Sequence, residues 1–117
     1  MKRMGTQMTE MLKGTLEGIV LSILAERPAY GYEITAELRD RGFTDIAEGT
    51  IYALLVRIER KSLVSVEKVA SEKGPPRKVF TLNAAGQLEL NEFWSTWNQL
   101  VERINHLPNQ NNTSKGN

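Results

Sequence analysis

The sequence contains no cysteine and a single histidine, His106. Disulfides, thiolate metal sites and cysteine nucleophiles are therefore excluded, and zinc sites or catalytic triads that depend on histidine are disfavoured. No apolar run approaches the roughly 18–20 residues that a membrane-spanning helix requires, and charged residues interrupt the region where a secretory signal would need its apolar core. These absences disfavour most enzyme classes. We expect a cytoplasmic, non-enzymatic protein that needs no metal or other cofactor.

The 117 residues are 40% apolar and 25% charged, which is typical of one soluble globular domain. The formal net charge of +1 conceals an uneven distribution along the chain. Residues 48–83 contain seven basic and four acidic side chains, whereas residues 1–47 and 84–117 each carry a net charge of −1. A local excess of positive charge is typical of a nucleic-acid-binding surface, but a solvated surface that happens to be basic explains it equally well.

The first strong sequence period is helical. Apolar residues recur at three- and four-residue steps from Leu12 to Leu24, and the pattern ends before Pro28, which cannot continue a helix. A second face of small and apolar residues, which includes Met11 and Gly18, lies beside this stripe. A helix with two such faces is expected to pack against something on each side.

Two shorter helices are predicted after it. One covers about residues 30–41, with Gly42 as its C-cap. The other covers about residues 48–61, and Asp45 and Glu48 have the spacing of a capping box at its start. Its apolar residues all fall on one side of the helix, which predicts that this side faces the core. They are Ile51, Leu54, Leu55 and Ile58.

The period then changes from helical steps to alternation. Residues 63–82 alternate apolar and polar side chains on either side of a Gly-Pro-Pro turn, which predicts a β-hairpin with a long, basic tip. Asn83 is placed to cap a fourth helix, which covers about residues 84–107. Residues 109–117 have nothing to bury and are expected to be disordered.

The chain is thus predicted to be mainly α with a small β-hairpin. Three helices followed by two strands are the layout of a winged helix-turn-helix DNA-binding domain, which we expect over residues 1–83. One C-terminal dimerisation helix is expected over residues 84–108, followed by the disordered tail. Three short helices and a hairpin also occur in domains that bind only proteins, so the layout by itself leaves both functions open.

The third predicted helix is the candidate recognition helix. Its side opposite the apolar stripe carries small residues, which allow a helix to enter a major groove about 12 Å wide. Hydroxyl and guanidinium groups at its edges can reach bases and phosphates, although an exposed helix that merely carries two arginines is the alternative. Tyr52 can instead pack between helices and touch a phosphate only through its hydroxyl. The candidate DNA-binding residues here are Thr50, Tyr52, Ala53, Arg57 and Arg60.

The hairpin tip is the second candidate DNA contact. Lys73, Arg77 and Lys78 surround the Gly-Pro-Pro turn, whose prolines reduce the entropy lost on docking. Such a wing lies along the DNA backbone or in the minor groove, where basic side chains add affinity but little sequence information. A charged tip that only keeps an edge hairpin soluble is the alternative.

The fourth predicted helix carries a strict heptad seam. A seam on the last helix of a domain whose core is already filled implies a partner helix, and the same helix of a second copy is the simplest partner. The alternative is that the seam packs entirely on the first helix of its own chain. The seam consists of Leu90, Phe93, Trp97, Leu100, Ile104 and Leu107.

Three motifs make the sequence similar to a known family. Residues 30–34 (YGYEI), 49–59 (GTIYALLVRIE) and 74–82 (GPPRKVFTL) resemble the PadR-like transcriptional regulators, in the same order. The single C-terminal helix resembles the small subgroup of this family that includes multidrug-sensing repressors. The chain departs from the family pattern in residues 61–64, which lack the usual glycine, and at Phe80 and Asn83, where tyrosine and threonine are commoner.

The resemblance implies a homodimer in which the last helix packs against the first helix of its mate, with an apolar opening at the dimer axis. In multidrug-sensing members a tryptophan on the last helix stacks on planar aromatic drugs, and Trp97 matches it by position. Phe93 lies one helical turn away, and Met11 and Gly18 on the spare face of the first helix are candidates to line the opening.

Three hypotheses follow for the function. The first is a homodimeric repressor that binds a promoter inverted repeat in double-stranded DNA and is released by a planar aromatic small molecule. The second is a DNA-binding regulator without an effector, in which Trp97 is merely packed. The third is a winged-helix module that binds another protein. Salt-dependent DNA affinity separates the third from the others, and quenching of tryptophan fluorescence separates the first from the second.

Overall fold

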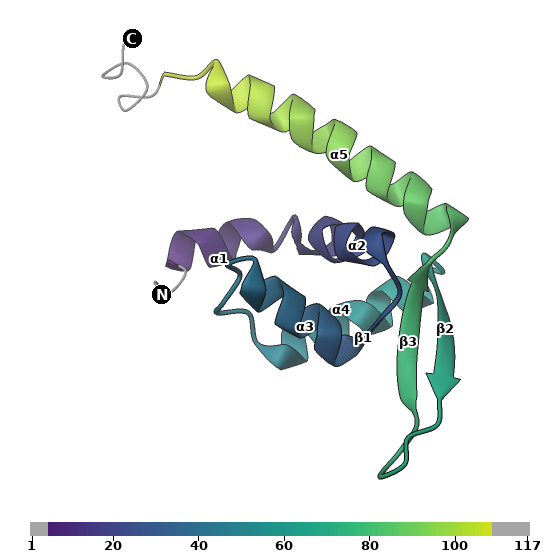
Figure 1. Cartoon of the computed structure of the whole chain (residues 1–117). Helices are drawn as coiled ribbons and strands as arrows, with labels where there is room; N and C mark the ends of the chain where they lie inside the picture. Colours follow the sequence, from purple (N-terminus) through teal and green to yellow (C-terminus); the bar gives the residue numbers. More distant parts are fainter. Residues whose placement is uncertain (1–4, 109–117) are drawn as a thin grey trace.

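The computed structural model describes residues 5–108 of the chain (Figure 1). It is mainly helical with a small antiparallel sheet, so the predicted winged-helix fold with one long C-terminal helix is confirmed. The predicted disordered segment, residues 109–117, lies outside the described residues. In chain order the elements are α1 (Thr6–Leu12), α2 (Leu16–Glu26), β1 (Ala29–Tyr30), α3 (Gly31–Asp40), α4 (Glu48–Arg60), β2 (Val64–Val69), β3 (Arg77–Leu82) and α5 (Ala84–Asn105).

The single first helix expected from the apolar period is wrong, because the chain turns between α1 and α2. The amide N–H groups of Lys13, Gly14 and Thr15 donate to the carbonyls three residues earlier, so the last turn of α1 tightens and the α-helix ends. Gly14 weakens any continuation because glycine has poor helix propensity. The apolar residues keep their helical spacing across this turn, so the sequence pattern could not reveal that the helix is broken there.

The predicted hairpin is part of a three-stranded sheet with the order β1-β3-β2. β2 and β3 pair in the register Val64↔Leu82 to Val69↔Arg77, and β1 adds the pairs Ala29↔Phe80 and Tyr30↔Val79. Sequence analysis missed β1, because two residues are too few to show any alternation. This short strand joins the base of the wing to the start of α3.

The core lies among α2, α3, α4 and the sheet, and the expected inward stripe of α4 is confirmed. From α5, Leu90 joins the core and Phe93 packs against it. The largest completely buried side chains are Val20, Leu21, Ile34, Leu38, Ile51, Leu55 and Ile58.

Helices α3 and α4 end in the same way. In both, the N–H of the second residue after the C-cap donates to the carbonyl five residues earlier, from Phe43 to Leu38 and from Leu63 to Ile58. The residue before it must then adopt a left-handed conformation. Gly42 does so at φ 99°, as expected, whereas α4 uses Ser62 at φ 61°.

The start of α4 differs from the expectation. Its N-cap is Ala47, without a side-chain hydrogen bond, so the predicted Asp45–Glu48 capping box is wrong. The cap of α5 is confirmed, because the side chain of Asn83 accepts a hydrogen bond of 2.8 Å from the Gly86 N–H. Gly86 lies against the Leu63 carbonyl, so that only glycine lets α5 begin this close to β2.

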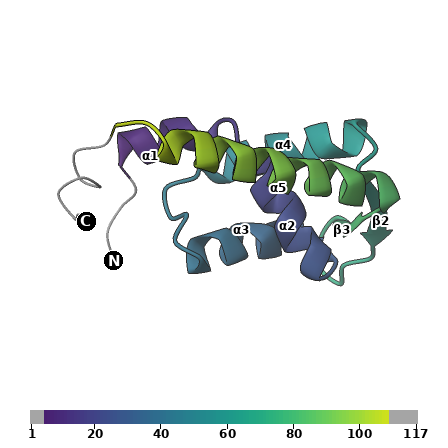
Figure 2. The same ribbon diagram turned by 90° about the horizontal axis from the view of Figure 1, so that it is seen from above.

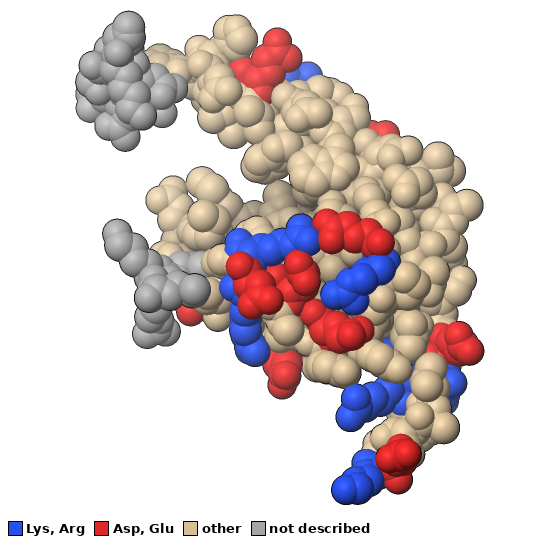
Figure 3. Space-filling model, in the orientation of Figure 1, with Lys and Arg blue, Asp and Glu red and all other residues tan. Residues whose placement is uncertain are grey.

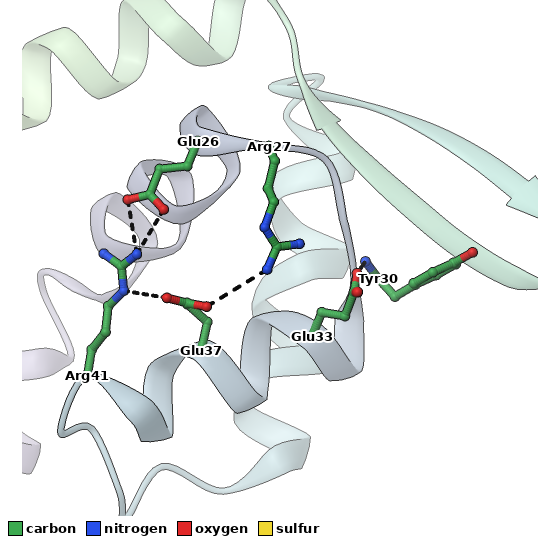
Figure 4. Close-up of polar contacts among 6 residues, drawn as sticks. All are labelled: Glu26, Arg27, Tyr30, Glu33, Glu37 and Arg41. Atoms are coloured by element: carbon green, nitrogen blue, oxygen red, sulfur yellow. Dashed lines mark hydrogen bonds and ion pairs between the residues drawn. The ribbon is translucent and has the colours of Figure 1, made fainter.

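An ion-pair cluster ties α2 to α3 on the surface (Figure 4). Arg41 donates to Glu37 at 2.7 Å and to Glu26 at 2.8 Å, and Arg27 lies 3.9 Å from Glu37. The hydrogen bonds that Arg41 donates to Glu37 and, second, to Glu26 raise the pKa of Arg41 above its ordinary value. All these groups are open to water to some degree, so the cluster adds little to stability beyond the core.

Candidate nucleic-acid interface

The exposed side of α4 presents a line of small side chains. Gly49, Ala53 and Val56 lie along it, with Arg60 at its C-terminal end, opposite the buried side. All four residues are exposed. A helix with this outline can approach the floor of a major groove without large side chains holding it away.

One edge of α4 faces α1 and α2. Thr50, Ala53 and Arg57 line a groove of about 620 Å³ there. Arg57 is 3.2 Å from Glu17 of α2, and Lys61 is 2.8 Å from the same carboxylate, whose side chain is only 17% exposed. Arg57 is therefore engaged within the chain, and a phosphate would have to replace Glu17. The helical spacing in the sequence could not identify Glu17 as the partner of Arg57, because the two residues are 40 positions apart.

The other edge of α4 faces α3 and the sheet. Tyr52 and Val56 line a groove of about 460 Å³ with Tyr30, Tyr32 and Phe80. The Tyr52 ring lies over Gly31, where a Cβ would be 2.6 Å from Cε1, yet the residue remains exposed. This position agrees with the expectation that Tyr52 packs between helices while its hydroxyl stays available.

The wing places its cations beside this groove. Lys73, Arg77 and Lys78 are exposed, with Arg77 and Lys78 at the start of β3 and Lys73 in the tip. The register sets Lys68 opposite Lys78, so a fourth cation joins the wing. Sequence analysis missed Lys68, although its place opposite Lys78 in the hairpin would have revealed it. Figure 3 shows Lys and Arg on the wing and also among the mixed charges over α2 and α3, while the face of α5 in view is largely uncharged.

The heptad seam of α5 divides into two parts. Leu90 is 4% exposed and sits in the core of its own chain, so the expectation that it contacts a second copy is wrong. Phe93 is partly buried, and its ring covers Gly18 at the point where a Cβ would project. Phe93 therefore covers Gly18 within the chain, and both residues border a small pocket of about 300 Å³ between α2 and α5. The expected place of Gly18 in a ligand opening at the dimer axis stays a prediction.

The rest of the seam is exposed. Trp97 is 39% exposed and Ile104 51%, and Leu100 and Leu107 are likewise open. In Figure 1 this part of α5 rises away from α1, and in Figure 2 it passes above α1. Met11 of α1 is exposed as well, so α5 and α1 each carry exposed apolar side chains within the described part of the chain. Figure 3 shows an open space between the two helices.

Among residues 5–108, no three acidic or histidine side chains come together as a metal site would require. No described helix combines the length and apolarity needed to cross a bilayer.

Comparison with known proteins agrees with this geometry. Residues 20–92 match the family described as "Transcriptional regulator PadR-like family". A PadR-like transcriptional regulator from Bacillus cereus is 38% identical, with a TM-score of 0.72 over 82% of this chain and 93% of that one. An uncharacterised protein of Lysinibacillus sphaericus is 30% identical over 82% of this chain and 90% of its own length.

A more distant structure shares the fold. Bacillus subtilis PadR, solved in complex with operator DNA, is 21% identical, with a TM-score of 0.62 over 68% of this chain and 46% of that one. The family match includes α4 and the wing, which form the candidate interface, and extends into the start of α5. This chain belongs to the PadR-like family of transcriptional regulators, a family of regulators rather than enzymes.

Proposed function

We propose that the chain is a homodimeric transcriptional repressor that binds an inverted repeat in a promoter and is released by a planar aromatic small molecule. The observation that carries the DNA-binding part is the small-residue face of α4 next to a wing with four cations. The DNA complex of Bacillus subtilis PadR supports it by fold. A regulator of this kind acts in the cytoplasm, where the promoter is.

In this proposal α4 enters the major groove and the wing follows the backbone. Ala53 and Val56 allow close approach, and Thr50, Tyr52 and Arg60 reach bases or phosphates from the edges of the helix. Lys73, Arg77 and Lys78 supply affinity that is independent of sequence. Arg57 contributes only by exchanging Glu17 for a phosphate.

Salt dependence of duplex binding tests this arrangement. Lys73→Ala should make the plot of log affinity against log salt shallower by about one unit per lost phosphate contact. Arg57→Ala should change it less, because Glu17 already neutralises this side chain. Arg27→Ala, which removes an equal charge on the surface of α2 away from α4, is the matched control. Equal slopes in Lys73→Ala and the control would exclude the wing as a DNA contact.

The dimer is supported by the exposed part of the α5 seam, which leaves four large apolar side chains uncovered in one chain. Coverage by a second copy would bury them between α1 and α5. Ile104→Asp should put a charge into this contact and dissociate the dimer, as measured by light scattering. Leu88→Asp is the matched control, since Leu88 is exposed on the side of α5 away from the seam. A wild-type monomer at micromolar concentration would exclude the dimer.

The effector is supported by Trp97, an exposed aromatic ring on the unpartnered surface of α5. A planar aromatic cation between two such indoles would gain about 0.5–1.5 kcal/mol from stacking beyond burial. It can release DNA only if it prefers a dimer whose two α4 helices do not match successive major grooves, about 34 Å apart.

Binding of a planar cationic dye tests the effector. The dye should quench tryptophan emission and weaken duplex binding, and Trp97→Ala should remove both responses while DNA binding stays intact. Trp94→Ala is the matched control, because Trp94 is similarly exposed but packs edge-on against Phe93. A wild-type protein that keeps its DNA in the presence of every dye would favour a regulator without an effector.

A further inference from the structure

The wing is held against the winged-helix body by two side-chain contacts near its tip. The guanidinium carbon of Arg77, at the start of β3, lies 5.2 Å from the centre of the Tyr32 ring in α3. The next residue, Lys78, places its Nζ atom 3.3 Å from Oε1 of Glu59 in α4. Both cations are among the proposed DNA contacts, so the residues that hold them affect how the wing meets DNA.

Tyr32 is itself fixed in place although it is 48% exposed. Its ring stacks on Tyr30, with a distance of 5.6 Å between ring centres and an angle of 13° between planes. Tyr30 is anchored twice: it pairs with Val79 in the sheet, and its N–H donates to Glu33 at 2.9 Å (Figure 4). Because the Tyr32 ring is exposed, it contributes little to the core. Its fixed position therefore indicates a role at the surface.

The Tyr32–Arg77 contact lies between the wing and the recognition helix. Both residues line the groove of about 460 Å³ that Tyr52 and Val56 of α4 also line. A guanidinium group stacked on an aromatic face keeps its N–H donors pointing outward in its own plane. Those donors remain available to a phosphate while the stack fixes where they lie.

We propose that Tyr32 is a positioning residue for DNA binding, which holds Arg77 and the tip end of β3 at a fixed place relative to α4. The proposal rests on the proposed DNA-binding function. Tyr32 acts through Arg77: its ring reduces the freedom that the long arginine side chain would lose on binding a phosphate. Its phenol oxygen is not required for this role.

The test is a double-mutant cycle on the full chain, read by fluorescence anisotropy with a labelled duplex of mixed sequence. Tyr32→Phe keeps the ring and should bind as the wild type does. Tyr32→Leu removes the ring and should weaken binding about two- to fivefold, the range expected for one exposed cation–π contact. Arg77→Gln should weaken binding at least as much, and Tyr32→Leu should add nothing in that background.

Glu59→Gln is the matched control for proximity. It breaks the neighbouring ion pair in the same groove without touching Arg77, so its effect should multiply with that of Tyr32→Leu. Hydrogen exchange of the free protein provides a second measurement. Arg77→Gln leaves α3 intact, and it should quicken the exchange of amides in residues 70–78 even if Tyr32→Leu fails to fold.

The outcomes separate this inference from the proposed function. A wild-type protein that does not bind the duplex contradicts the proposed function itself. If the wild type binds, the positioning role is overturned by multiplicative effects of Tyr32→Leu and Arg77→Gln, or by unchanged exchange in Arg77→Gln. It is also overturned if Tyr32→Phe binds as weakly as Tyr32→Leu, since the hydroxyl would then contact DNA directly.

Discussion

The winged-helix body and the distal segment, residues 94–107, are both rich in large apolar side chains, but the body buries most of its own and the distal segment does not. In the body, which runs from α2 to Phe93, the stripes of α2, α3 and α4 meet in one core. In the distal segment, which comprises the last part of α5 and the two residues after it, the same heptad pattern continues with its apolar side chains open to water. One sequence pattern therefore specifies packing within the chain in the first region and requires another surface in the second.

Helix α5 changes from one region to the other at Phe93. Up to this residue the seam packs on α2, where Gly18 admits the Phe93 ring. Beyond it the helix diverges from α1 (Figure 1), and among residues 5–108 nothing covers the seam. Equivalent substitutions in the two regions should thus have unequal effects.

The largest difference is expected between two isoleucines of the two regions. Ile58→Ala opens a cavity in the core, where Ile58 is fully buried, and should lower the free energy of unfolding by about 2–5 kcal/mol. Ile104→Ala should change it by no more than about 0.5 kcal/mol in an isolated chain. Urea unfolding at two protein concentrations measures both.

Concentration dependence decides what covers the distal seam. If a second copy covers Ile104, the cost of Ile104→Ala should grow with protein concentration, because the dimer is then the state that loses the contact. The loss of unfolding free energy caused by Ile58→Ala should not depend on protein concentration, because Ile58 packs within its own chain. A large cost of Ile104→Ala that is independent of concentration would contradict the division of the molecule into two regions.

Gly18→Ala tests the boundary itself. A Cβ there would collide with the Phe93 ring, so the ring must rotate away and α5 must loosen from α2. We expect a loss of about 1–3 kcal/mol, the usual range for overpacking. Because Trp94 packs edge-on against Phe93 at 5.0 Å, tryptophan emission should shift as well. Gly14→Ala, where nothing lies within 4 Å of a new Cβ, should do neither.

Ser62→Gly tests the left-handed backbone conformation that ends the recognition helix, α4. Ser62 holds a left-handed conformation that costs an ordinary residue about 1–2 kcal/mol, whereas glycine adopts it without strain but loses more entropy on folding. The net gain should be somewhat under about 1 kcal/mol. Gly42→Ala, at the matching position after α3, should show the opposite sign. Thermal unfolding of the two variants measures both effects.

The sequence predicts the body better than its details, and residues 61–64 illustrate why. The absence of the glycine that is common there in the family is visible in the sequence, but the structure is needed to show that Ser62 bears the left-handed φ. Helical and alternating periods report which face is buried, so α3, α4, the hairpin and α5 were predicted. They do not reveal the turn at Gly14, because the apolar residues keep their helical spacing across it. They do not reveal β1 either, because this strand is too short to show alternation.

The candidate site divides in the same way. The exposed face of α4 follows directly from its buried face, so Ala53 and Arg60 were found by spacing. Contacts between distant positions were not, because neither charge nor period connects Arg57 to Glu17 or Arg77 to Tyr32. The partly buried seam was also beyond prediction, since Leu90 and Ile104 occupy equivalent heptad positions and differ only in what lies opposite them.

The smallest effect on stability is expected from a substitution of Arg41, a surface cation of the body that pairs with two carboxylates. Arg41 joins Glu26 and Glu37, yet its side chain is open to solvent, where water and salt weaken each attraction. Arg41→Gln should therefore lower the melting temperature slightly in dilute buffer, and the difference from wild type should vanish in concentrated salt. The core, and not this cluster, would then hold α2 on α3. A large drop in melting temperature that persists in concentrated salt would mean that these ion pairs, together with the buried side chains, stabilise the contact between α2 and α3. Surface charge would then contribute to the difference between the closed body and the exposed seam.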